Sequence, residues 1–428
     1  MGVMLRTQEI EEHIARLNLP GLPPDKAVIP NYNGYSIRAI PHFVRSLFGD
    51  PVEGARALID AMDPPLKGPV EKVILLIIDG FGFHHLLDLL QRFPDLYLHR
   101  LIERGRCIPL TSVFPATTAT ALPTLCTGLT PQEHGMVGYR LYLKEISAIT
   151  NMIRLTTERS AEAGSAVEAG IDVQRFLGTP TLYAQLHQLG VDTHVVLSRH
   201  IASSGLSSLL YDGNARLHPV VNLSDMLVVA RRILQRTSGR AFVSLYWGGT
   251  DAIAHIHGPW TEEFAAELHT VDTAIARELE GQVGQALFII TSDHGFVPME
   301  ASDYRLIKDE PELSRNLVLP PVGEPRATYL YVREGKKRAM AEMIRERFGD
   351  ELICLDAGSA LEAGLFGQGP VKAEVADRIG DLLVISVGKT ALFHPHKDAA
   401  MLKGVHGGLT AREMLVPLIV SRLQEKEE

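Results

Sequence analysis

The segment KVILLIIDGFG, residues 72–82, decides the fold class of this chain. Lys72 is followed by six consecutive apolar residues, most of them β-branched. Such a run is typical of a strand that is buried on both faces of a parallel sheet. The run ends at Asp79, and a helical pattern follows at residues 84–92. The segment therefore predicts a strand, a polar turn and a helix, which together form the repeating unit of an α/β protein.

The same alternation extends through most of the chain. Predicted strands cover residues 107–113, 192–197, 241–245, 286–291 and 414–420, and predicted helices cover 182–189, 224–236 and 261–280. Because strands and helices alternate, we expect an α/β fold with a mostly parallel central sheet and helices on both faces. Residues 300–400 differ in character, and their strands at 327–332 and 381–387 around one helix predict a small α+β lobe.

The length of 428 residues exceeds what one simple core usually holds. We therefore predict an N-terminal wrapping segment at 1–68, a core formed by 69–299 and 401–428, and a small α+β insert at 300–400 that caps the core.

The composition is that of an ordinary globular protein, with 46% hydrophobic and 22% charged residues. A net charge of −9 gives no basic surface for stable nucleic-acid binding, but it is compatible with a small phosphorylated substrate such as a nucleotide. The three cysteines lack a CxxC spacing, so we interpret them as reduced thiols.

The sequence also bears on location. The first residues contain Glu-Glu-His where a signal peptide would need an apolar run, and no segment approaches the roughly 20 apolar residues of a membrane span. We therefore expect a cytoplasmic protein without a membrane association, and the sequence leaves a homo-oligomer open.

Carboxylates and imidazoles follow several predicted strands. Asp79 follows the first, Asp251 and His255 follow the strand at 241–245, and Asp293 with His294 follow the strand at 286–291. His406 lies in a glycine-rich turn before the last strand. Each alone is more often a turn or surface residue. Because ligands bind beyond the carboxyl ends of parallel strands, the set together predicts a site for two divalent ions, Zn²⁺ or Mn²⁺.

A threonine-rich segment, TSVFPATTATALPTLCTGLTPQEHGMVGY at residues 111–139, provides a candidate nucleophile. Small hydroxyl residues before a helical run usually cap the helix. Thr117 and Thr118 both precede the predicted helix, so we expect one to cap it and the other to attack a substrate. The positive end of a helix and a nearby metal ion would both lower the pKa of an attacking hydroxyl.

These motifs resemble the alkaline phosphatase superfamily, and within it the type I phosphodiesterases and nucleotide pyrophosphatases. The similar segments are IIDGFG (77–82), PQEHGMVGY (131–139), DAIAHIHGP (251–259), TSDHGF (291–296) and VHGGLTAREMLVPLIV (405–420), together with Thr118, nine positions before Thr127 of the TG pair. The resemblance implies that Asp251, His255 and His406 hold one zinc ion. It implies that Asp79, Asp293 and His294 hold the other, and that Thr118 is a nucleophile bound to this second ion.

One position departs from the pattern of the phosphodiesterases. Their asparagine three residues after the nucleophile is Ala121 here, so a substitute donor is expected from Asn151 or Arg140. The resemblance implies a two-metal phosphoester hydrolase with a phosphothreonine intermediate, acting on phosphodiester or nucleotide pyrophosphate bonds. The alternatives are a phosphomonoesterase or phosphonate hydrolase of the same superfamily, and a binding module without catalytic activity.

Overall fold

The computed structural model describes residues 2–62, 66–160, 162–211, 213–394 and 402–424. Its central sheet has seven strands in the order β2-β18-β9-β1-β8-β6-β7. The bounds are β1 Lys72–Ile78, β2 Arg106–Thr111, β6 Asp192–Ser198, β7 Arg216–Val220, β8 Ala241–Trp247, β9 Leu287–Thr291 and β18 Leu415–Arg422. Strand β18 runs antiparallel to both neighbours, whereas the pairs formed by β9, β1, β8, β6 and β7 are parallel. The predicted fold class is confirmed.

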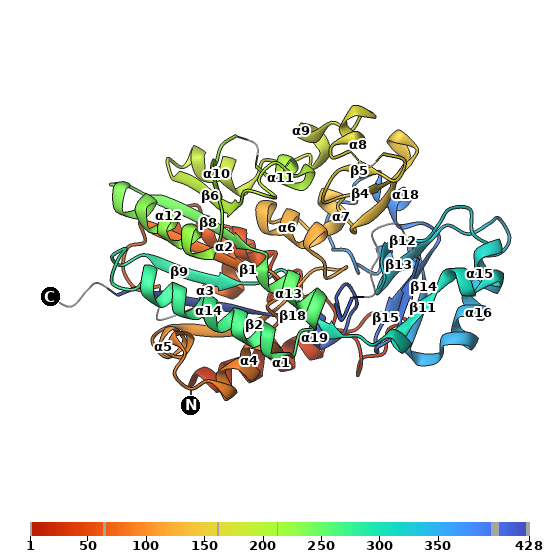
Figure 1. The fold of residues 1–428 in the computed structure, drawn as a ribbon, viewed down its shortest axis with the longest axis horizontal. Coiled ribbons are helices and arrows are strands. Elements are labelled where there is room, and N and C mark those ends of the chain that lie inside the picture. Colours follow the sequence, from red (N-terminus) through yellow and green to blue (C-terminus); the bar gives the residue numbers. More distant parts are fainter. Residues whose placement is uncertain (1, 63–65, 161, 212, 395–401, 425–428) are drawn as a thin grey trace.

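Helices cover both faces of this sheet, as predicted (Figure 1). One group contains α2, α6 and α10, which contact one another, and another contains α5, α12 and α14. The bounds of the main helices are α1 Gly2–Ala15, α2 Ala39–Leu47, α3 Arg56–Ala61, α4 Phe83–Arg92, α5 Tyr97–Arg104, α6 Thr118–Thr127, α10 Leu182–Gln188, α12 Leu223–Arg236, α13 Gly249–His257 and α14 Glu262–Glu278. In the part of the chain that the structure describes, none of the helices combines the length and apolar character needed to cross a membrane.

The register of the parallel strands brings their carboxyl ends to one place. Ile78 at the end of β1 pairs with Trp247 at the end of β8, and Ile77 pairs with Thr291 at the end of β9. Helix α6 follows β2, and α13 follows β8 at the same end of the sheet. Figure 1 shows both helices at the end of the central sheet that faces a second sheet.

The second sheet is antiparallel and has seven strands in the order β14-β15-β13-β12-β3-β4-β5. It combines β12 Val322–Glu324, β13 Ala327–Leu330, β14 Leu352–Asp356 and β15 Leu382–Ser386, flanked by helix α16 Lys337–Phe348, with β3 Arg140–Leu143, β4 Ala148–Asn151 and β5 Thr156–Thr157. The predicted insert at 300–400 thus supplies one part of this sheet, and residues 140–157 supply the other. A single pair, Gly323 with Arg140, joins the two parts. The division into domains stays a prediction.

The N-terminal segment connects the two sheets. The backbone N–H of Ile37 donates to Thr111 at 2.9 Å, beside the end of β2. The Tyr32 hydroxyl accepts a hydrogen bond from the backbone N–H of Phe114 and donates to the backbone oxygen of Leu365, each at 3.1 Å. Residues 32–37 therefore link the central sheet to the segment that follows β14.

A buried ion pair joins the second sheet to the segment just before β18, the last strand of the central sheet. Arg326, in the turn between β12 and β13, donates to both carboxylate oxygens of Glu413, at 2.6 and 2.9 Å. Neither side chain is exposed to solvent. Glu413 also accepts hydrogen bonds from Gly408, at 2.7 Å, and from Thr410. The pair therefore fixes the loop that carries His406 against the second sheet.

Replacing Glu413 by glutamine should destabilise the protein strongly, because it would leave the Arg326 guanidinium buried without its counter-charge. We expect the free energy of unfolding in denaturant titrations to fall by about 3–5 kcal/mol. The matched control is Glu342→Gln, which breaks the exposed pair with Arg338 and should change stability by less than about 0.5 kcal/mol. Equal losses in the two variants would contradict this account.

Candidate active site

The strand ends place three aspartates in one crevice. Asp79 follows β1 directly, and its backbone N–H donates to Trp247 at the end of β8 (2.9 Å). Asp293 lies two residues beyond β9, and Asp251 lies in the first turn of α13. Asp79 and Asp293 have almost no exposed surface. The parallel register thus brings together carboxylates that are far apart in the sequence.

The structure gathers the predicted ligand residues into two groups of possible metal ligands. Asp251, His255 and His406 form one group. Asp79, Asp293 and His294 form the other, and within each group the candidate ligand atoms lie within 4.8 Å of one another. These are the two sets that the sequence predicts. Their role as metal ligands stays a prediction.

The histidines of both groups are held in the orientation that a metal ligand needs. The ring Nδ1 atoms of His255, His294 and His406 lie 2.8, 3.1 and 3.0 Å from the backbone oxygens of residues 404, 295 and 116. A hydrogen bond to a carbonyl places the ring proton on Nδ1 and leaves Nε2 as a lone-pair donor. The Nε2 atom of His255 lies 3.3 Å from Asp251 Oδ1, and that of His294 lies 3.4 Å from Asp79 Oδ1.

Asp79 and Asp293 each use one carboxylate oxygen for hydrogen bonds and leave the other available for a metal ion. One oxygen of Asp79 accepts a hydrogen bond from the Tyr246 hydroxyl, and Asp293 Oδ1 accepts one from the backbone N–H of His294 at 3.0 Å. The other oxygens, together with Asp251 Oδ1, are buried and have no hydrogen-bond partner among the described residues. Buried carboxylate oxygens without a partner are costly. Their position beside imidazole Nε2 atoms fits divalent cations of the zinc or manganese type.

Electrostatics in the crevice support the same conclusion. Burial, together with the negative charges of Asp251 and Asp293, raises the pKa of Asp79 well above its usual value. Burial, with the neighbouring His294 and His255, holds the pKa of His406 well below its usual value. His406 is therefore neutral at physiological pH, which is the form that binds a metal ion. A bound cation would offset this concentration of buried negative charge.

Thr118 is the first residue of α6, beside the second group. Its hydroxyl oxygen lies 3.2 Å from His294 Nε2. Thr117 occupies the N-cap position, but its side chain makes no capping hydrogen bond. The expectation that one of the two threonine hydroxyls caps the helix is therefore wrong. The Thr117 hydroxyl is a hydrogen-bonding neighbour of Glu324 instead.

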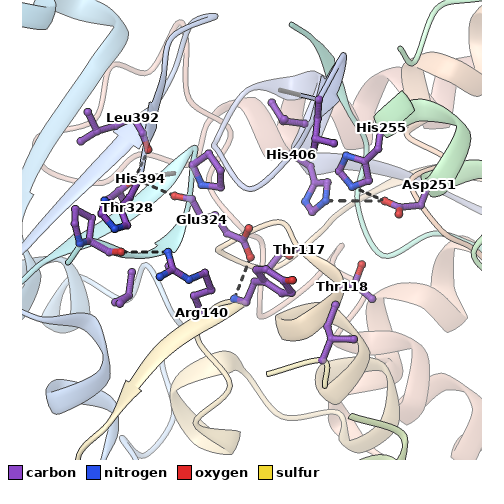
Figure 2. Close-up of a pocket in the computed structure, with 18 residues that line it drawn as sticks. Thr117, Thr118, Arg140, Asp251, His255, Glu324, Thr328, Leu392, His394 and His406 are labelled. Carbon is purple, nitrogen blue, oxygen red and sulfur yellow. Dashed lines mark hydrogen bonds and ion pairs between the residues drawn. The ribbon is translucent and has the colours of Figure 1, made fainter. Parts of the chain in front are cut away.

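A cavity of about 290 Å³ opens beside the first group (Figure 2). Its wall includes Thr117, Thr118, Arg140, Glu324 and the residues of the first ligand group. In Figure 2 the Arg140 side chain lies on the far side of Glu324 from Asp251 and His255. Arg140 pairs with Glu158 and contacts the backbone oxygen of residue 321 at 3.4 Å.

The other residues considered at sequence level lie elsewhere. Asn151 is not part of the cavity wall, and its side-chain amide donates to the Tyr139 hydroxyl at 2.7 Å. Ala121 is fully buried within α6. Asn151 could therefore act on a substrate only through Tyr139, which does line the cavity. The assignment of Arg140 or Asn151 as a phosphoryl-binding donor stays a prediction.

Several residues of the site were not predicted from the sequence. Among them are Tyr246, on the Asp79 carboxylate, and Tyr139 and Glu324, in the cavity wall. Tyr246 is the last residue but one of β8. In the sequence it is one aromatic residue in an apolar strand, so the pattern did not mark it as a site residue. Burial raises the pKa of Glu324 to about 7 against the opposing effects of Thr117 and the Tyr139 backbone.

Comparisons with known proteins agree with this geometry. A family model for type I phosphodiesterase / nucleotide pyrophosphatase matches residues 73–409. The fold is similar to that of murine ectonucleotide pyrophosphatase / phosphodiesterase 5, with a TM-score of 0.61 and 17% identity over 82% of this chain and 88% of that chain. An inactive form of that murine protein was solved in complex with AMP.

A bacterial protein has a similar fold as well. Phosphonoacetate hydrolase from Sinorhizobium meliloti 1021, in complex with phosphonoformate, has a TM-score of 0.61 and 19% identity, over 84% of this chain and 92% of that chain. Comparison with curated protein sequences finds no match. At these identities the solved structures show a shared fold.

The crowded carboxylates predict an unusual effect of charge removal. In the protein stripped of metal by a chelator, Asp79→Asn should raise the melting temperature at pH 7. The pKa of Asp79 is raised in the folded state, so the folded protein resists ionisation and loses stability as the pH rises above the ordinary aspartate value near 4. The gain from the variant should therefore shrink as the pH falls towards about 4.

The control for this measurement is Asp60→Asn, which removes an exposed carboxylate and should leave the melting temperature nearly unchanged at both pH values. A metal-free Asp79→Asn protein that melts below metal-free wild type at pH 7 would contradict the electrostatic account.

Proposed function

Because the chain belongs to the type I phosphodiesterase / nucleotide pyrophosphatase family, we propose that it is a metal-dependent phosphoester hydrolase with Thr118 as its nucleophile. Phosphodiester or nucleotide pyrophosphate bonds are the proposed substrates. The observation that carries this proposal is the position of the Thr118 hydroxyl. It lies at the start of α6, 3.2 Å from His294 Nε2, and it lines the cavity in which a substrate can bind.

The two groups of carboxylates and imidazoles would hold the metal ions. Asp251, His255 and His406 are the proposed ligands of one Zn²⁺ or Mn²⁺ ion, and Asp79, Asp293 and His294 are those of the other. When bound, two such ions supply positive charge to the phosphoryl oxygens and to the attacking and leaving oxygens. Zinc is our first choice, because the ligands combine imidazoles with carboxylates.

The residues of the chain then have defined roles. The Thr118 oxygen would attack phosphorus in line with the leaving oxygen, and its hydroxyl proton would pass to solvent. A bond forms between Thr118 and phosphorus as the bond to the leaving oxygen breaks, and a leaving alkoxide takes up a proton from solvent. Water then hydrolyses the phosphothreonine, which releases phosphate or a phosphate monoester and restores the hydroxyl.

The start of α6 contributes to holding the phosphoryl group. Backbone N–H groups in the first turn of a helix have no partner within that helix, and they point towards an anion placed at its N-terminus. The N–H groups of Thr118 and Ala119 are in this position. These N–H groups provide hydrogen-bond donors close to the nucleophile, whereas the methyl side chain of Ala121 provides none.

Phosphonate or phosphate monoester hydrolysis is the second candidate. The cavity of about 290 Å³ lies at the lower limit of ordinary ligand pockets, which hold roughly 300–1,000 Å³. A compact substrate fits this volume better than a dinucleotide does. Initial rates on aryl phosphate diester, aryl phosphate monoester, a phosphonate and an aryl sulfate, each with added zinc or manganese, would separate these activities. Hydrolysis of the sulfate alone would overturn the proposal.

We expect the purified protein to contain close to two Zn²⁺ or Mn²⁺ ions per chain, and chelation to abolish hydrolysis. His406→Ala should lose most activity and about one ion, measured by elemental analysis. The control is His257→Ala, which changes an exposed histidine on the same helix as His255 and should keep both ions. Chelator-resistant activity in a protein without a transition metal would contradict the two-ion site.

Thr118→Ala should lower turnover by roughly a thousandfold or more, because it removes the nucleophile, while metal content is retained. Thr117→Ala should have a much smaller effect on turnover. Thr120→Val is the matched control, since the buried Thr120 hydroxyl has no hydrogen-bond partner among the described residues and its loss should cost little. A phosphoryl group trapped on Thr117, or the opposite order of the two losses, would place the nucleophile one residue earlier.

A further inference from the structure

A carboxylate outside both ligand groups lies in the wall of the active-site cavity. Glu324 is the last residue of β12 in the second sheet, and only 6% of its surface is exposed. Figure 2 shows its side chain between Arg140 on one side and Thr117 and His406 on the other. A buried carboxylate is costly unless it has hydrogen-bond partners, so its presence in a substrate cavity requires an explanation.

Glu324 is held firmly in this position. Its Oε1 accepts a hydrogen bond from the backbone N–H of Tyr139 at 3.0 Å, and its backbone oxygen accepts one from the Thr328 hydroxyl at 2.9 Å. The adjacent Gly323 has a φ of 86°, and a Cβ there would lie 2.4 Å from the backbone oxygen of Ala327. A Cβ on Gly407 would lie 3.0 Å from that of Glu324. The stem of the Glu324 side chain is thus packed directly against the His406 loop.

The rest of the cavity wall offers little positive charge. Much of it is aliphatic, as in Ile153, Val322, Leu392 and Val405. Arg140 is the one arginine or lysine among the described residues that line the cavity, but its guanidinium is already paired with Glu158, which does not line the cavity. A negatively charged part of a substrate would therefore meet Glu324 without a free compensating cation beside it. A hydrogen-bond donor would meet an acceptor.

We infer that Glu324 is a specificity-determining residue, which accepts a hydrogen bond from a hydroxyl or ammonium group on the ester arm of the substrate. The substrate class is then a phosphoester of a compact polyol or amino alcohol, whose carbon chain contacts the aliphatic wall. This inference rests on the proposed function, since it assigns the part of the substrate that extends from Thr118 towards the second sheet.

The test uses two diesters that differ only in one donor, bis(2-hydroxyethyl) phosphate and bis(2-methoxyethyl) phosphate, and the corresponding monoesters. Both arms have similar electron-withdrawing effects, so a difference in kcat/KM reports recognition of the hydroxyl. We expect wild type to favour the hydroxyethyl arm by roughly tenfold or more, which is the size of one hydrogen bond to a carboxylate. Glu324→Ala should abolish this preference.

Two further variants make the test specific. Glu324→Gln keeps an acceptor oxygen, so it should retain a preference for the hydroxyethyl arm while losing any preference for a 2-aminoethyl arm. Glu351→Ala removes a carboxylate that accepts hydrogen bonds from Thr390 outside the cavity, and it should keep the wild-type ratio. Metal content and melting temperature are measured for every variant. If Glu324→Ala does not fold, the test becomes the loss of the preference for bis(2-aminoethyl) phosphate over bis(2-methoxyethyl) phosphate in Glu324→Gln.

The outcomes separate the inference from the proposed function. Hydrolysis of an aryl phosphate reference by wild type, with equal kcat/KM for the two arms, would overturn the inference and leave the function in place. A preference that persists in a folded, metal-replete Glu324→Ala protein would also overturn it. If neither the reference nor any ester is hydrolysed with zinc or manganese, both the function and the inference fail.

Discussion

Mutual repulsion among three aspartates, of which Asp79 and Asp293 are buried, is the constraint on which the rest of this structure depends. Two negative charges about 4 Å apart repel by roughly 4 kcal/mol at an effective dielectric constant of 20. The candidate ligand atoms of Asp79 and Asp293 lie within 4.8 Å of each other, and the negative charges of Asp251 and Asp293 both raise the pKa of Asp79. The fold opposes the repulsion with directed polar contacts. Tyr246 donates to Asp79, and backbone N–H groups donate to Asp293. Carbonyl oxygens hold the histidine rings so that their lone pairs point inward. The crevice is therefore built for cations.

The central sheet and the second sheet contribute different properties to the site. Parallel pairing of β1 with β8 and β9 fixes the positions of the aspartates. A shift of the strand register by one residue would turn every side chain of the strand to the opposite face of the sheet. The antiparallel strand β18 returns the chain, so that the loop before it can place His406. The pair of Arg326 with Glu413 then ties that loop to the second sheet. As a result, the reactive residues and the substrate wall are fixed relative to each other.

Much of this arrangement could be predicted from the sequence, for physical reasons that particular residues illustrate. The run after Lys72 is apolar throughout because both of its faces are buried, and the observed strand has the predicted bounds Lys72–Ile78. The aspartates and histidines could be predicted as a set because the carboxyl ends of parallel strands must meet. The partners of Tyr246 and Glu324 could not, since each contact joins segments more than 160 residues apart. Short antiparallel strands such as β5, with two residues, carry no periodic signal at all. The sequence wrongly predicted a capping hydrogen bond from a threonine hydroxyl, because it does not show that Glu324 lies close enough to bind the Thr117 hydroxyl instead.

The junction within the second sheet explains why specificity should be determined there. In the described part of the chain, one strand pair, Gly323 with Arg140, connects the half of the second sheet that precedes β8 and β9 in the sequence with the half that follows them. Tyr139 and Glu324 flank this pair, and both line the cavity. A change in the length or pairing of either segment would move the cavity wall without moving the aspartates, whose positions depend on the central sheet alone. The proposed chemistry of bond cleavage and the proposed recognition of the ester arm would therefore be held by separate sheets. We expect substitutions at the junction to alter the preferred substrate while the proposed catalytic residues stay in place.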